Sequence, residues 1–126
     1  MTIIEARHLI KSYGKNANEF QALKGVSFQI EEGESVAIIG KSGSGKTTLM
    51  HILALLDQPT LGEIIINQVT ANKIKKHEVN RMRNQLFGFV FQQFFMNSKD
   101  TVLNNVMLPL KIAGVSKRER KKQALK

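Results

Sequence analysis

The sequence has no cysteine among its 126 residues, which excludes a disulfide framework and a thiolate metal site. It also has no apolar run that approaches the roughly 20 residues needed to span a bilayer. The first residues, Met1–Arg7, lack the basic start and apolar continuation of a secretory signal. We therefore expect a chain that does not cross a membrane by itself, and the lack of cysteine suits a reducing cytosolic setting.

The positive charge of the chain is not spread evenly. The formal net charge is +9; residues 73–85 hold five basic residues and Glu78, and residues 117–126 hold six basic residues and Glu119. Few aromatic side chains lie between these basic residues, whereas proteins that bind single-stranded nucleic acid use aromatic side chains for stacking. Both segments are typical of solvated surface helices, so we expect no specific nucleic-acid partner.

Residues 40–48 carry the pattern G-x-x-x-x-G-K-[ST] of a phosphate-binding loop. In this pattern backbone N–H groups point inward around a phosphate, Lys46 reaches the β- and γ-phosphates, and the Thr47 hydroxyl ligates Mg²⁺. The apolar run Ser35–Ile39 before the loop predicts a buried strand. The apolar stretch Thr47–Leu56 after it predicts a helix whose N-terminal dipole favours anions. The candidate phosphate-binding residues are Gly40, Lys41, Ser42, Gly43, Ser44, Gly45, Lys46, Thr47 and Thr48.

The rest of the chain predicts strands that alternate with helices. His51, on the apolar helix after the loop, is expected in the core. Residues 101–112 are helical in part, and Pro109 should kink or interrupt them. A capping-box pattern at Ser116 predicts the start of another helix. Strands are predicted over Thr2–Ser12, Ala22–Ile30, Gly62–Asn67 and Leu86–Phe91, and a helix near 75–85. This alternation around a phosphate loop indicates the α/β fold class.

The motif spacing narrows the choice of nucleotide. A dinucleotide-binding fold needs G-x-G-x-x-G, which is not the glycine spacing of residues 40–48. A GTPase would need an Asp-x-x-Gly and an Asn-Lys-x-Asp, and the segment Asn72–Lys75 lacks the final aspartate that would read guanine. ATP is therefore favoured over GTP by elimination.

An ordered set of motifs resembles the nucleotide-binding domain of ABC transporters. The set covers essentially the whole chain, and within the family it is most similar to the ATPases of lipoprotein release, macrolide export and peptide resistance. The fold that this resemblance implies is an ABC-type P-loop NTPase domain. The segments that carry it, besides the phosphate loop, are Lys11–Gly14, Ala22–Phe28, Glu32–Glu34, Gly88–Gln92, Thr101–Val106 and Leu108–Leu110.

The resemblance implies roles for single residues. Tyr13 would stack on the adenine of ATP, and the loop from Gly40 to Thr48 would hold the phosphates. Gln92 would contact Mg²⁺ or the attacking water and sense the γ-phosphate, so Lys46 and Gln92 are the catalytic candidates and Thr47 and Gln92 the candidate metal ligands. Two turn residues depart from the family pattern, Leu61 before Gly-Glu and Gln68 after Asn67, without touching the chemistry.

The resemblance also implies an incomplete domain. The family's Leu-Ser-Gly-Gly-Gln signature, catalytic glutamate and switch histidine are not in the sequence and would lie beyond Lys126. Residues 1–91 would then be the ATP-binding core and residues 92–126 the Q-loop and the start of the helical subdomain. We expect this chain alone to bind nucleotide weakly and to hydrolyse it hardly at all.

In the family, such a domain pairs with a second ATP-binding subunit and drives a transmembrane permease. We therefore expect a cytoplasmic protein, peripheral on the inner face of the membrane, that couples Mg–ATP binding and hydrolysis to export. Two other classes stay open: a DNA-repair or chromosome-maintenance ATPase of the wider ABC class, and a non-catalytic nucleotide-binding fragment. Salt-dependent binding to duplex DNA would favour the first of these.

Overall fold

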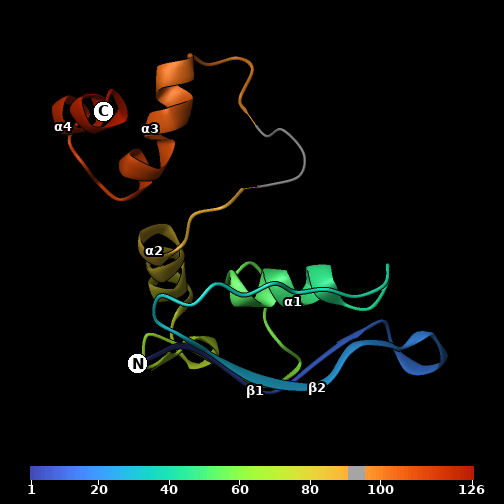
Figure 1. Ribbon diagram of the computed structural model, residues 1–126. Helices are drawn as coiled ribbons and strands as arrows, with labels where there is room; N and C mark the ends of the chain where they lie inside the picture. The colour runs from blue at the N-terminus through green and yellow to red at the C-terminus, as the bar shows by residue number, and fades with distance from the viewer. Residues whose placement is uncertain (91–95) are drawn as a thin grey trace. The chain divides into compact units, whose positions relative to one another are not determined.

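The computed structural model describes residues 1–90 and 96–126. The chain forms two compact units, Met1–Val79 and Asn80–Lys126. In Figure 1 the first unit runs from blue to yellow-green and the second continues to red. The helix α2 (Lys76–Leu86) begins in the first unit and ends in the second, and it confirms the helix predicted near residues 75–85.

The first unit contains an antiparallel sheet of four strands in the order β2-β1-β3-β4. The long strands β1 (Thr2–Tyr13) and β2 (Phe20–Glu31) form a hairpin, and β1 also pairs with β3 (Leu61–Ile66). In β2 the half-buried Val26, Phe28 and Ile30 alternate with exposed residues, so this strand turns one apolar face inward. The three longer strands confirm the predicted ones to within two residues at each end.

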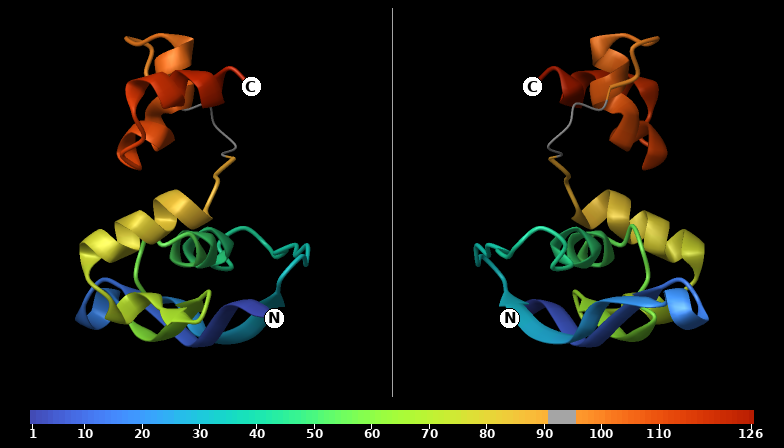
Figure 2. Two further views of the ribbon diagram at one scale, coloured as in Figure 1. Left: turned by 90° about the vertical axis from the view of Figure 1, so that its left-hand side faces the viewer. Right: turned by 90° about the vertical axis from the view of Figure 1, so that its right-hand side faces the viewer.

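The helix α1 (Lys46–Leu53) covers one face of this sheet, as Figure 2 shows. Its buried residues Leu49, Ile52 and Leu53 recur at helical spacing, and together with Leu9 and Ile64 from the sheet they belong to the core. The remaining buried apolar residues of this unit are Ala6, Leu23, Ala54, Leu55, Ile66 and Ala71. The phosphate loop is thus anchored to a helix that is itself held against the sheet.

Two predictions about α1 are wrong. His51 is exposed, because it lies on the helix face opposite Leu49 and Leu53. The helix also ends before Leu56, since Leu55 takes a φ of +60° and the N–H groups of Leu55 and Leu56 donate to the carbonyls of Ile52 (3.1 Å) and His51 (2.8 Å). This is the hydrogen-bond pattern of a Schellman cap, in which the left-handed residue is usually glycine. Because Leu55 stands at that position, nothing in the sequence indicated that the helix ends there.

Two predicted strands are not formed. Residues 35–39 have no regular secondary structure, and Ile39 is 90% exposed. Leu86 is the last residue of α2, residues 87–90 are likewise irregular, and Phe91 lies outside the described residues. No strand of the sheet among the described residues pairs with either stretch. A strand requires a neighbour to hydrogen-bond its backbone, so apolar composition alone does not produce one.

The hairpin between β3 and β4 (Val69–Thr70) turns through Asn67 and Gln68. Both residues have positive φ, +49° and +69°, as in a type I′ turn, where glycine is favoured at the second position. A residue with a Cβ is strained in the left-handed conformation, and glycine is not. We therefore expect Gln68→Gly to stabilise the fold by about 0.5–1 kcal/mol. Urea denaturation would measure this change. Gln21→Gly, in the extended backbone of β2, is the matched control and should destabilise instead.

The second unit contains α3 (Val102–Ile112) and α4 (Lys117–Ala124). Each begins at a side-chain cap: Thr101 Oγ1 accepts from the Asn104 N–H (3.1 Å) and Ser116 Oγ from the Glu119 N–H (3.4 Å). The predicted start at Ser116 is confirmed. Of the two effects expected at Pro109, a kink or an interruption, the interruption is wrong: α3 continues to Ile112, and the following turn closes with the Ala113 N–H donating to the Pro109 carbonyl (3.0 Å).

The first unit also has two short 3₁₀ segments, Asn16–Asn18 between β1 and β2, and Ala71–Lys73 after β4. None of the helices in the described part of the chain has the length and apolar character that crossing a bilayer requires.

Candidate nucleotide-binding site

The glycine-rich loop wraps around the N-terminus of α1. Gly43 and Gly45 both have left-handed φ, +80° and +93°, and Gly45 is the residue directly before the helix. The Ser44 N–H donates to the Lys41 carbonyl at 3.1 Å and closes the loop into a tight turn. A side chain at Gly45 would place its Cβ 2.5 Å from the Ala22 carbonyl oxygen. The loop therefore needs glycine both for its backbone angles and for its close approach to β2.

Lys46 is the first residue of α1, and its side chain folds back along the loop. Its ammonium group donates a hydrogen bond to the Gly40 carbonyl. This position places a positive charge inside the curl of the loop, beside the positive end of the helix dipole. Phosphate oxygens that enter the loop would accept the same protons, so the local chemistry suits a strongly anionic group.

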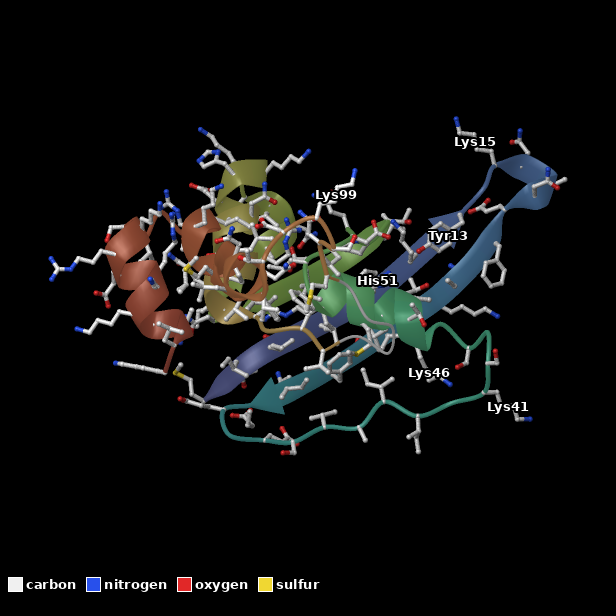
Figure 3. All side chains as sticks on the ribbon, turned by 90° about the horizontal axis from the view of Figure 1, so that it is seen from above. Tyr13, Lys15, Lys41, Lys46, His51 and Lys99 are labelled. Carbon is white, nitrogen blue, oxygen red and sulfur yellow. The ribbon has the colours of Figure 1, made fainter. Side chains whose placement is uncertain are left out.

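A cavity of about 390 Å³ lies in front of the loop, and it joins segments that are distant in sequence. Figure 3 shows Tyr13 and Lys46, which both line it, near the same end of α1. Gly40, Lys41 and Ser44 belong to the same loop but do not line the cavity, and Gln92 lies outside the described residues. The described lining residues are Tyr13, Phe20, Ala22, Ser42, Gly43, Gly45, Lys46, Thr47 and Thr48.

Tyr13 is held by contacts on its ring and on its hydroxyl. The Lys11 ammonium lies 5.3 Å from the ring centroid, and the Tyr13 hydroxyl donates to Asp57 Oδ2 at 3.5 Å. Lys11 Nζ also donates to Asp57 Oδ1 (3.1 Å) and to the Gln58 carbonyl (2.8 Å). Burial opposes ionisation of Asp57, but hydrogen bonds from the Gln58 N–H, Lys11 and Tyr13 outweigh it, so the pKa of this carboxyl is lowered.

Phe20 is a lining residue that sequence reasoning missed. The strand predicted from sequence begins at Ala22, whereas β2 begins at Phe20, directly opposite Tyr13 in the hairpin register. The available signal was an aromatic residue at the end of a polar loop. Its place in the cavity depends on strand register, which that signal does not give.

A glycine-rich loop at a helix N-terminus, facing a cavity with aromatic side chains at one end, defines a P-loop nucleotide-binding protein. Residues 23–126 match the family described as ABC transporter. The chain belongs to the ABC transporter family, and its α/β fold corresponds to the N-terminal part of the P-loop ATP-binding domain of that family.

Individual relatives agree with the predicted subgroup. The lipoprotein-releasing system ATP-binding protein LolD of Saccharophagus degradans is 38% identical over 122 residues, which are 97% of this chain and 54% of that protein. The macrolide export ATP-binding/permease protein MacB of Campylobacter fetus is 42% identical over 118 residues, 94% of this chain and 18% of that protein. The resemblance to lipoprotein-release and macrolide-export ATPases is confirmed.

Solved structures agree with the fold. The ATP-binding cassette MJ0796, in a dimeric post-hydrolysis state bound to ADP and Pi, matches with a TM-score of 0.87 and 40% identity. The match covers 98% of this chain and 54% of the MJ0796 chain. The chain thus spans about half the length of LolD and of MJ0796.

Proposed function

We propose that the chain is the nucleotide-binding half of an ATP-binding subunit that couples Mg–ATP binding and hydrolysis to export across a membrane. The observation that carries this proposal is the cavity that joins Tyr13 to the phosphate loop. The names of LolD and MacB, a lipoprotein-releasing and a macrolide-export protein, support the export direction. Both relatives are also named as ATP-binding, which supports ATP as the nucleotide.

The phosphates would lie in the loop from Gly40 to Thr48, held by its backbone N–H groups and by Lys46. Thr47 follows Lys46 and is one of the residues that line the cavity. No group of three or more His, Asp and Glu side chains that could hold a metal lies among the described residues. Mg²⁺ would therefore be held by phosphate oxygens and water, with the Thr47 hydroxyl as a protein ligand, a mode that this ion favours.

Hydrolysis needs more than a loop that holds the phosphates. When bound, Mg²⁺ neutralises charge that develops on the phosphates. In the proposed mechanism Lys46 holds the β- and γ-phosphates, and Gln92 positions the attacking water or contacts Mg²⁺. The polarising glutamate and the opposing signature motif are not found among residues 1–126, so in this proposal the isolated chain binds ATP weakly and hydrolyses it hardly at all.

The proposed partners are a second ATP-binding subunit and a transmembrane permease, which place the protein on the cytoplasmic face of the membrane. MJ0796, which aligns with 98% of this chain, is described as dimeric, and MacB combines ATP-binding and permease functions in its name. These two descriptions support the pairing and the membrane partner respectively.

Titration calorimetry with Mg–ATP tests the proposed base contact. Tyr13→Ala should weaken binding by about fivefold or more, because stacking of a base on an aromatic ring contributes about 1–3 kcal/mol. Tyr13→Phe keeps the ring and loses only the hydrogen bond to Asp57, so it should bind within about twofold to threefold of the wild type. Equal affinities of the wild type and Tyr13→Ala would contradict the proposed site.

A further inference from the structure

The cavity in front of the phosphate loop has an aromatic end formed by two rings. Tyr13 and Phe20 line it together and are 42% and 58% exposed. The other described lining residues are small or polar, and apart from Ala22 they come from the phosphate loop and the start of α1. The cavity therefore combines an apolar surface for a flat ring with a polar loop for phosphates.

The hairpin holds the two rings in a defined arrangement. Tyr13 and Phe20 are directly opposite in the β1–β2 register, so their side chains project from the same face of the sheet with Cβ atoms about 5 Å apart. The turn between them includes Gly14, whose φ is +80°, and a side chain there would collide with the Asn18 carbonyl. The chain thus closes tightly between the two aromatic residues and fixes their pairing.

The Tyr13 ring makes a cation–π contact within the protein. The Lys11 ammonium lies over the ring, and Lys11 is not among the residues that line the cavity. Tyr13 thus lines the cavity, whereas Lys11, which lies over its ring, does not. Because Phe20 is the facing residue of the register pair, it extends this ring surface across the end of the hairpin.

We propose that Phe20 is a second base-contacting residue, forming with Tyr13 an aromatic wall for the purine of a nucleoside triphosphate. This inference rests on the proposed function, since it assigns the base subsite of the same cavity. None of the described lining residues has an amide or carboxylate side chain that would read the edge of the base. Contact through ring faces accepts any purine, so Phe20 strengthens the binding of ATP and GTP by the same factor.

A single tryptophan would report this contact directly, because the chain contains no tryptophan. Phe20→Trp keeps an aromatic ring at the wall. Its emission should change on addition of Mg–ATP or Mg–GTP, but not of magnesium tripolyphosphate, which has no base. Leu61→Trp is the matched control: Leu61 is an exposed apolar residue of β3 (62%) that does not line the cavity, and a tryptophan there should not respond.

Phe20→Ala adds an affinity measurement by calorimetry. We expect it to weaken Mg–ATP and Mg–GTP binding by about fivefold or more and to leave tripolyphosphate binding unchanged. Weaker tripolyphosphate binding would mean that Phe20 only supports the fold of the site, and it would overturn the inference. So would wild-type ATP affinity in Phe20→Ala together with a silent Phe20→Trp, while the proposed function would stand. A wild type that binds neither ATP nor tripolyphosphate would overturn both proposals.

Discussion

Lys46→Ala is expected to weaken Mg–ATP binding by about tenfold to a hundredfold, the largest effect of any single substitution in the site. A hydrogen bond between a charged donor and a phosphate contributes about 1.5–3 kcal/mol. Lys46 is placed to make such bonds because its ammonium group already lies inside the curl of the loop, on the Gly40 carbonyl. Calorimetric titration with Mg–ATP and with magnesium tripolyphosphate would measure the loss for both ligands.

The matched control for Lys46 is Lys24→Ala. Lys24 is an exposed lysine of β2 that does not line the cavity, so its loss changes the net charge equally without touching the site. We expect wild-type affinity for this variant. If both lysine variants weakened binding to the same extent, the effect would be one of overall charge, and the proposed role of Lys46 would be wrong. Lys46→Arg keeps the charge but not the compact ammonium, and it should recover only part of the affinity.

The phosphate loop could be predicted from sequence because all the residues of its motif are neighbours along the chain. Glycines at fixed spacing, followed by Lys46 and Thr47, specify both the backbone geometry and the groups that meet a phosphate. In the structure Gly43 and Gly45 have left-handed angles, and Lys46 is the first residue of α1. The strands β1 and β2 could likewise be predicted from local composition, whereas their pairing into a hairpin could not.

The features that sequence reasoning missed depend on partners that are distant along the chain. Phe20 enters the cavity only because the hairpin register sets it opposite Tyr13. Residues 35–39 have the composition of a strand, yet no described strand pairs with them, and Val36 and Ile39 stay exposed. The helix face that is buried likewise depends on how α1 meets the sheet, which is why His51 was misplaced. Composition limits which structures such residues can adopt, whereas strand pairing and packing determine whether they form a strand or become buried.

Gly45→Ala is expected to lower both the stability of the fold and the affinity for nucleotide, because Gly45 links the phosphate loop to the sheet. Its φ of +93° is strained for any other residue, which costs about 1–3 kcal/mol. The new Cβ would also lie 2.5 Å from the Ala22 carbonyl oxygen and 3.2 Å from Leu23 Cδ2, and such overpacking costs about 1–3 kcal/mol more. We expect a total loss of roughly 3 kcal/mol or more, which urea denaturation would measure.

Gly25→Ala separates the two causes of the expected loss of stability, the left-handed backbone strain and the steric contact with β2. Gly25 lies in β2 with a φ of +99°, close to that of Gly45, but a Cβ there would meet nothing within 4 Å. It should therefore lose only the conformational part, about 1–3 kcal/mol, and keep wild-type affinity for Mg–ATP. Gly45→Ala should lose more stability than Gly25→Ala and, in addition, weaken Mg–ATP binding, because relief of the contact with Ala22 moves the loop off the sheet. Equal losses of stability with unchanged binding would show that the contact with β2 does not position the phosphate loop.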